Sequence, residues 1–130
     1  MGKSRKVIAV GCHDGEYYKN RPDRCETYSA RGKRSLGERK PDIVAPGTDI
    51  ISCSANFQIN RWGVRNAYVK KSGTSMATAI VSGALGVLFA VHGEYGNTHA
   101  KQKLLYSARD LGEPWCKQGY GMLDFENLLL

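Results

Sequence analysis

One long apolar segment, preceded by Gly73-Thr74-Ser75, constrains the fold of this chain more than any other feature. Between residues 75 and 91 the apolar side chains fall on every side of a helical wheel, which leaves no polar face. A helix of that kind has to be surrounded, so we expect Ser75 to Val91 to form a central helix buried on all sides. Its glycine and alanine residues would let neighbouring backbones approach closely.

The start of this helix is a place for chemistry. Backbone N–H groups are unpaired in a first helical turn, and with the positive end of the macrodipole they stabilise negative charge. A carbonyl attacked by the Ser75 hydroxyl would develop its oxyanion in that environment, so Ser75 is the candidate nucleophile. The alternative is structural, because serine and threonine favour helix caps in any protein.

The rest of the chain alternates extended and helical patterns. β-Branched runs predict strands at 6–11, 42–45 and 49–53, the last two separated by a Pro46-Gly47 turn, and the first buried in a parallel sheet. Apolar spacing predicts an amphipathic helix from Asn97 that closes at Leu111-Gly112, and a last helix over 125–130 capped by Asp124. We expect residues 56–66 to form a loop, either surface decoration or the leaving-group side of a substrate cleft.

Four segments in succession resemble the landmarks of the subtilisin-like serine proteases. They are Val7-Ile8-Ala9-Val10-Gly11, the run from Lys40 to Ile50 containing Ala45-Pro46-Gly47, Gly73-Thr74-Ser75-Met76-Ala77-Thr78, and Gly119-Tyr120-Gly121-Met122-Leu123-Asp124. The resemblance implies an α/β fold: the C-terminal part of a three-layer, parallel-sheet domain with a central buried helix starting at the nucleophile. Residues 1–130 would then be a partial peptidase domain.

The resemblance also implies roles for individual residues. Ser75 would attack the peptide carbonyl and form an acyl-enzyme, Thr74 would add a hydroxyl near the oxyanion, and the sulfur of Met76 would lie beside the serine. The family's catalytic Asp and His and its oxyanion Asn would lie upstream of Met1, and neither an Asp-Ser/Thr-Gly nor a His-Gly-Thr sequence occurs here. We therefore expect negligible peptidase activity from this chain alone. The alternative function is a non-catalytic remnant that acts as an oligomeric or interaction module.

The three histidines of the chain are poorly placed to replace the missing base. His13 follows the first predicted strand, and His99 falls in the loop after the long helix. His92 is roughly 25 Å along the helix axis from Ser75, at about 1.5 Å per residue, which is beyond hydrogen-bond reach. We expect solvated or capping roles for all three.

The charge pattern does not indicate a nucleic-acid partner, and the cysteine pattern indicates no metal cofactor. The net charge of +7 is spread along the chain without a recognition helix, zinc spacing or aromatic-interleaved basic strand, which favours a solvated basic surface over nucleic-acid binding. The cysteines at 12, 25, 53 and 116 include no Cys-x-x-Cys pair, so we expect no metal and free thiols; the alternative is two disulfides in a longer, secreted precursor. Calcium binding is possible in a complete domain, but no acidic cluster assigns a site.

The resemblance places part of the domain upstream of this chain, and the surfaces that this part would cover determine which partners we expect. Without it, a sheet edge and the flank of the long helix would be open to water, and such surfaces associate. We expect a homo-oligomer or a complex with an upstream fragment of the same protease. Met76 to Val91 falls short of the roughly 20 residues of a membrane span, and nothing after Met1 reads as a secretory signal, so we expect no membrane insertion and a cytoplasmic location.

Overall fold

The computed structural model describes residues 6–15, 28–32 and 39–130 of the chain. A small parallel sheet forms its centre: β1 (Val10–His13) pairs with β2 (Ile43–Pro46) in the register Val10↔Ile43 to His13↔Pro46. On the other side of β2, Val44 forms a parallel bridge to Met122, so the segment before the last helix extends the sheet. The expected parallel sheet is therefore confirmed.

The first strand begins later than the predicted residue 6. The N–H of Ala9 donates to a side-chain oxygen of Asp42 at 2.7 Å. The same oxygen accepts from Lys40 Nζ at 2.6 Å, and Lys101 Nζ donates to the carbonyl of Val7 at 2.7 Å. Side chains from distant parts of the chain thus bind the backbone before Val10, and regular pairing starts only where they end.

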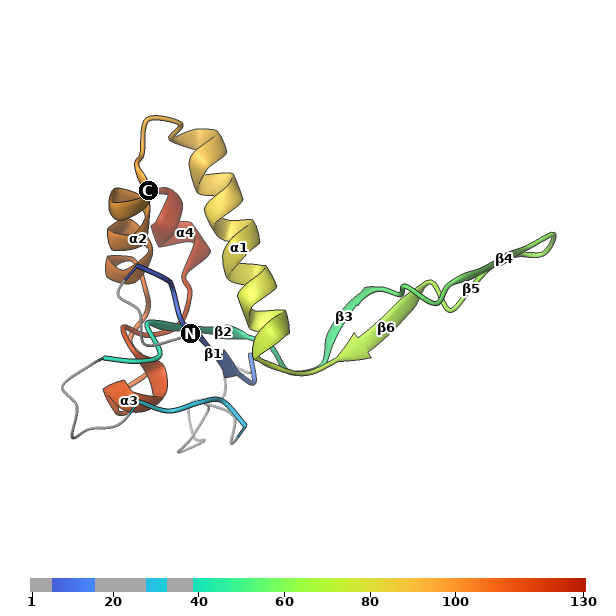
Figure 1. Ribbon diagram of the computed structural model, residues 1–130, viewed down its shortest axis with the longest axis horizontal. Coiled ribbons are helices and arrows are strands. Elements are labelled where there is room, and N and C mark those ends of the chain that lie inside the picture. The colour runs from blue at the N-terminus through green and yellow to red at the C-terminus, as the bar shows by residue number, and fades with distance from the viewer. Residues whose placement is uncertain (1–5, 16–27, 33–38) are drawn as a thin grey trace.

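Helices cover one face of the sheet, and they lie above it in Figure 1. The long helix α1 (Thr74–Val91) packs on β1 and β2 and touches both α2 (Asn97–Tyr106) and α4 (Phe125–Leu129). Its buried residues recur at helical spacing and meet the fully buried side chains of the sheet and the other helices; the cluster comprises Ile43, Ala45, Ala77, Val81, Ala84, Leu88, Ala100, Leu104 and Leu128. This is the hydrophobic core of the described chain.

The opposite face of α1 is exposed, which differs from the expectation of a helix buried on all sides. Ala79, Gly83, Gly86, Val87 and Ala90 are accessible to solvent, and a Cβ built at Gly83 or Gly86 would meet nothing within 4 Å. By length and composition α1 could also cross a membrane, with 22% of its span buried. Its packing on β1 and β2 is that of a core helix covered on one side. The expectation that its flank is open to water is confirmed.

The C-terminal segment agrees with its predicted capping. The Asp124 side chain accepts a hydrogen bond from the N–H of Asn127 at 3.1 Å and so caps α4. Arg109 donates to the other carboxylate oxygen at 3.2 and 3.1 Å. A short helix, α3 (Trp115–Gln118), lies between α2 and α4.

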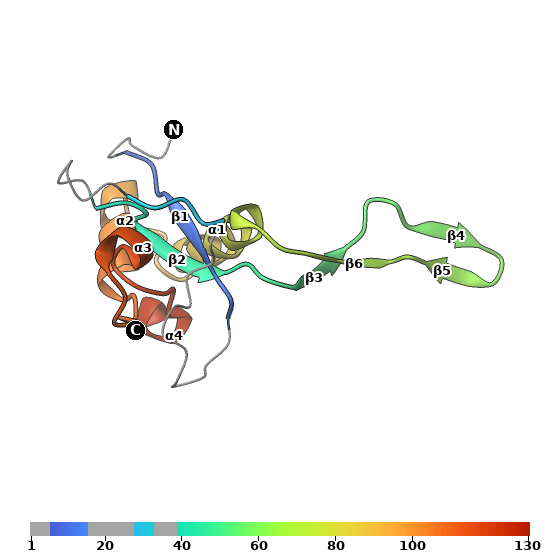
Figure 2. The same ribbon diagram turned by 90° about the horizontal axis from the view of Figure 1, so that it is seen from below.

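A long β ribbon projects from the base of α1, as Figures 1 and 2 show. Antiparallel strands β3 (Ile50–Cys53) and β6 (Tyr68–Lys71) form its inner half, and β4 (Gln58–Asn60) and β5 (Gly63–Arg65) form its outer half. We call residues 50–71 the arm. The prediction of a loop over 56–66 is wrong, because Ile59 and Val64 pair across a two-residue turn at Arg61-Trp62.

Candidate active site

Ser75 is the second residue of α1, and its side chain is exposed. Gly73 occupies the position before the helix with φ of 155°, a conformation that favours glycine. Neither Thr74 nor Ser75 caps the helix, since no side-chain cap is formed there. The predicted placement of Ser75 on the first turn is confirmed, and the alternative of a capping serine does not hold.

The helix start includes backbone N–H groups that have no acceptor among the described residues. Met76 and Ala77 donate their N–H groups to the carbonyl of Gly73, at 3.0 and 3.4 Å. Within the described ranges no acceptor is found for the N–H groups of Thr74 and Ser75. These free donors, at the positive end of an 18-residue helix, form an environment that stabilises an anion beside the Ser75 hydroxyl.

Hydrogen bonds connect this turn to the end of the sheet. The N–H of Gly73 donates to the carbonyl of Gly47 at 2.8 Å, and the N–H of Gly47 donates to the carbonyl of His13 at 3.0 Å. A Cβ at Gly47 would lie 2.6 Å from Cys12 Sγ, 2.8 Å from the carbonyl oxygen of Gly73 and 3.1 Å from the Ala77 Cβ. Glycine is therefore required at 47 for the strand end to approach the start of α1.

A small polar cluster lies next to the turn that contains Gly47 and Thr48. The Cys12 thiol is fully buried and lies 3.4 Å from the hydroxyl of Tyr28, which in turn is 2.9 Å from Thr48 Oγ1. The Cys12 N–H donates to Ser29 Oγ at 2.9 Å on the outer edge of β1. Residues 28 and 29 thus hold β1 and, through Thr48, the turn that contains Gly47.

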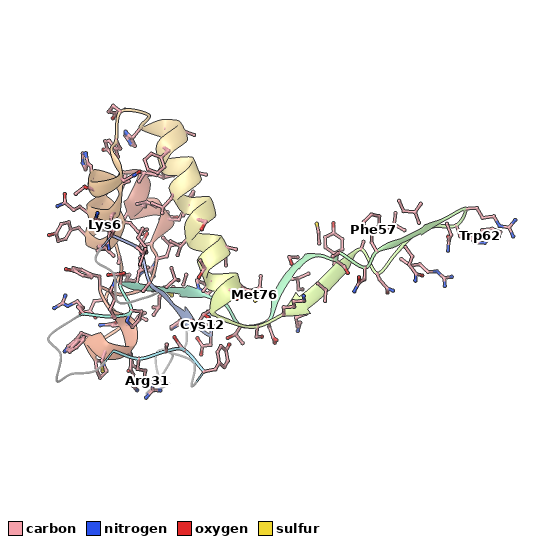
Figure 3. The ribbon with its side chains drawn as sticks, viewed as in Figure 1. Lys6, Cys12, Arg31, Phe57, Trp62 and Met76 are labelled. Carbon is pink, nitrogen blue, oxygen red and sulfur yellow. The ribbon has the colours of Figure 1, made fainter. Side chains whose placement is uncertain are left out.

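Thr74 and Met76 flank the serine and are both half-buried. The carbonyl of Thr74 accepts from Thr78 Oγ1 at 2.8 Å, while the sulfur of Met76 would lie 3.6 Å from a Cβ at Gly73. Figure 3 shows Met76 at the junction of α1 and the arm. Their roles in stabilising an oxyanion and flanking the nucleophile stay predictions.

His92 and His99 both stack on Tyr95 beyond the end of α1, whereas His13 lies near the start of that helix. His13 ends β1 and is buried, with Nδ1 accepting from the N–H of Gly15 at 2.8 Å, so its expected solvation is wrong, and it closes the turn after a strand instead of capping a helix. His92 follows the last residue of α1 and stacks on Tyr95, and His99 lies in α2 rather than in a loop. Asn97 begins α2, near the end of α1 that lies opposite to Ser75, so it is not placed to act as the oxyanion Asn.

The cysteines and acidic residues form no metal centre in the part of the chain described. Cys12, Cys53 and Cys116 are free thiols, as expected for these three; Cys25 lies outside the described residues. Cys12 is buried, Cys53 is exposed on the arm, and Cys116 lies in α3.

Comparison with known proteins identifies relatives of this chain. The model of the subtilase family matches residues 2–122. Serine protease AprX of Bacillus subtilis is 40% identical over 93 residues, which are 67% of this chain and 21% of AprX. Halolysin of Haloferax mediterranei is 38% identical over 86 residues, which are 66% of this chain and 15% of halolysin. The chain thus spans a minor part of the length of these relatives.

Solved structures show the same fold. Fervidolysin from Fervidobacterium pennivorans, described as a keratinolytic enzyme related to subtilisin, superposes with a TM-score of 0.75 at 22% identity, covering 98% of this chain and 19% of fervidolysin. The prenylagaramide maturation protease PagA superposes with a TM-score of 0.73 at 26% identity, covering 98% of this chain and 43% of PagA. With residues 2–122 matched by the family model, the chain belongs to the subtilase family.

Proposed function

We propose that this chain is the C-terminal part of a serine endopeptidase that hydrolyses peptide bonds through Ser75. One observation carries the proposal: an exposed serine hydroxyl stands on the first turn of α1, beside two backbone N–H groups without an acceptor in the described residues. Membership of the subtilase family supports a serine protease fragment. The proposed reaction needs no cofactor.

The reaction proceeds in two acyl-transfer steps. Ser75 Oγ attacks the peptide carbonyl carbon and gives its proton to a histidine of an upstream polypeptide, while the free N–H groups stabilise the oxyanion. Collapse of the intermediate breaks the C–N bond, and the amine leaves with the proton from that histidine. Water then attacks the Ser75 ester and gives its proton to the histidine, which returns it to Ser75 as the acid product leaves.

The open surfaces of the chain support a need for an upstream polypeptide. One face of α1 is exposed, and β1 has β2 as its only strand neighbour among the described residues. The chain corresponds to 21% of AprX and 15% of halolysin. We infer that the rest of a peptidase domain packs against this face and this edge, and brings the catalytic histidine to Ser75. In subtilisin, the well-studied example, removing the triad serine or histidine lowers turnover by about 10⁶, so the chain alone should be nearly inactive.

A fluorophosphonate probe tests the proposal directly, because it labels only activated serines. We expect labelling of Ser75 in a mixture of this chain with the polypeptide encoded immediately upstream, and little labelling of either alone. The Ser75→Ala variant is the control for the site. Ser82→Ala, about two helical turns further along the exposed face of α1, is the matched control. Absence of labelling in a mixture that forms a complex would contradict the proposal.

A second function is favoured by the exposed face of α1: a non-catalytic module that associates with itself or with a partner. It makes a different prediction for the same mixture. Association without any labelling of Ser75 would support the module, while association with labelling would support the peptidase.

A further inference from the structure

The arm combines features that nothing in the proposed chemistry uses. Its residues 50–71 include no acidic residue and four basic ones, Arg61, Arg65, Lys70 and Lys71. Large apolar side chains are exposed along its whole length, with 80% exposure at Trp62 and 73% at Ile59; the others are Ile51, Phe57, Val64 and Tyr68. Figure 3 shows Phe57 and Trp62 along the arm, with Trp62 at the tip.

Both halves of the arm are two-stranded, so their outer edges have unpaired backbone groups. Among the described residues, β3 pairs only with β6, and β4 pairs only with β5. Unpaired edges accept an additional extended strand from another polypeptide, as in β-strand addition. This property favours a polypeptide ligand over a nucleic acid, whose backbone has no N–H donors to pair with the carbonyl groups of a strand edge.

The charge of the arm selects an acidic ligand. Lys70 Nζ lies 3.5 Å from Asp49 at the base of the arm, and the guanidinium of Arg61 lies over the Trp62 ring, 5.0 Å from its centroid. Arg65 is exposed and has no ion-pair partner in the described residues. The chain itself has a net charge of +7, so a second copy is electrostatically disfavoured as the ligand.

The position of the arm connects its ligand with the nucleophile. Strand β6 ends at Lys71, and the chain reaches Ser75 after one short turn, in which Ser72 Oγ accepts from the N–H of Asp49 at 2.8 Å. A polypeptide aligned along the arm would therefore extend toward the start of α1. We propose that the arm is a binding site for an acidic, extended segment of the polypeptide substrate, which it holds by strand addition and by contacts with its basic and aromatic side chains.

This inference deepens the proposed function and rests on it for the identity of the ligand, but the binding itself requires no catalysis. The test measures fluorescence anisotropy of a labelled peptide in which glutamate alternates with valine, titrated with the 130-residue chain. We expect saturable binding that weakens as salt is raised, because the screening length shortens. A peptide with lysine in place of glutamate should bind much more weakly.

Matched variants locate the site on the arm. Arg65→Glu should weaken binding roughly fivefold, the scale of an exposed ion pair converted to a repulsive one. Lys103→Glu on α2 changes the net charge equally and should leave binding within about twofold. Trp62→Ala should weaken binding about threefold or more, whereas Tyr106→Ala, which removes a similarly exposed aromatic from α2, should not.

Photo-crosslinking of the unmodified chain gives a second measurement that does not depend on variants. A benzophenone-bearing acidic peptide should crosslink to residues of the arm, mapped by mass spectrometry. Crosslinks confined to α2 or the sheet, equal losses for Arg65→Glu and Lys103→Glu, or stronger competition by a single-stranded oligonucleotide than by the acidic peptide would each overturn the inference. So would crosslinks abolished by the upstream polypeptide, which would then be the occupant of the arm.

The outcomes separate this inference from the proposed function. Binding on the arm without fluorophosphonate labelling of Ser75 in the mixture would retain the arm as a polypeptide-binding site and contradict the enzyme. Labelling of Ser75 without peptide binding would retain the enzyme and overturn the role of the arm.

Discussion

At the scale of single residues, the site depends on glycines that let backbones meet. Gly47 lies between the end of the sheet and the turn before Ser75, and its position leaves no room for a side chain against Cys12 and Gly73. The hydroxyl of Ser75 is thus positioned by a residue that has no functional group.

Gly47→Ala should destabilise the chain by about 1–3 kcal/mol, the usual cost of inserting a methyl group into a packed site. Gly86→Ala is the matched control, because its Cβ would meet nothing within 4 Å and alanine is favoured in a helix by roughly 0.5–1 kcal/mol. Urea unfolding measures both. Equal midpoints for Gly47→Ala and the unchanged chain would contradict the packing described for this turn.

Asp124, at the start of α4, contributes to the stability of the fold in a way that depends on pH. The hydrogen bond from the N–H of Asn127 lowers the pKa of its carboxyl group; partial burial opposes this, and the charge of Arg109 adds to the lowering. A carboxylate with a lowered folded pKa stabilises the fold above its unfolded value of about 3.9, and that stabilisation is lost as the pH falls through the folded pKa.

Asp124→Ala should therefore cost about 1 kcal/mol at neutral pH, as for other lost helix caps. The difference from the unchanged chain should shrink in urea unfolding below a pH of about 4, as the carboxyl group becomes protonated first in the unfolded and then in the folded state. Asp124→Asn, which keeps a capping oxygen, should lose less at neutral pH. A difference that stays constant down to acid pH would assign the effect to packing instead.

At the scale of elements, α1 and the arm differ in how they are stabilised. One face of α1 is inserted in the core through residues such as Leu88, which is fully buried. The outer half of the arm has strand partners only within itself, among the residues that the structure describes. The arm can therefore change without affecting the body of the protein.

Replacing residues 55–66 by Asn-Gly should leave the thermal unfolding midpoint nearly unchanged, because the new turn keeps the hydrogen bond from Ser54 N–H to the Ala67 carbonyl. Leu88→Ala, by contrast, should cost about 2–5 kcal/mol through loss of core packing. Circular dichroism during heating compares the two variants. A large decrease for the shortened arm would show that it supports the body.

At the scale of the whole molecule, we propose that association involves the exposed face of α1 and the outer edge of β1. An exposed apolar helix face beside an open sheet edge favours self-association when no other partner is present. The net charge of +7 opposes it, so association should strengthen with added salt.

Light scattering after size exclusion should accordingly give a mass above that of one chain, rising with concentration. Val87→Lys, on the exposed face of α1, should lower the mass toward that of a monomer. Tyr106→Lys on α2 adds the same charge at another exposed apolar residue and should have a smaller effect. A monomer at every concentration and salt level would contradict this association.

Much of the local structure could be predicted because its signals lie within a few residues. The Gly73-Thr74-Ser75 start of α1, the Asp124 cap of α4 and the β-branched residues of β2 and β3 all lie where expected. Polar and apolar residues also alternate along the arm at Ile59 and Val64, which pair with each other. This alternation is typical of strands, and the prediction of a loop did not take it into account.

The sequence by itself determined where α1, α2 and α4 begin, that the residues of β2 and β3 are extended, and which serine stands at a helix start, since periodicity, capping and turn chemistry act over short distances. Only the tertiary structure decided that Asp42 delays the start of β1, that residues near Met122 join the sheet, and that α1 is covered on one face. These features depend on contacts between segments far apart in the chain, and no local pattern specifies which distant neighbour will be present.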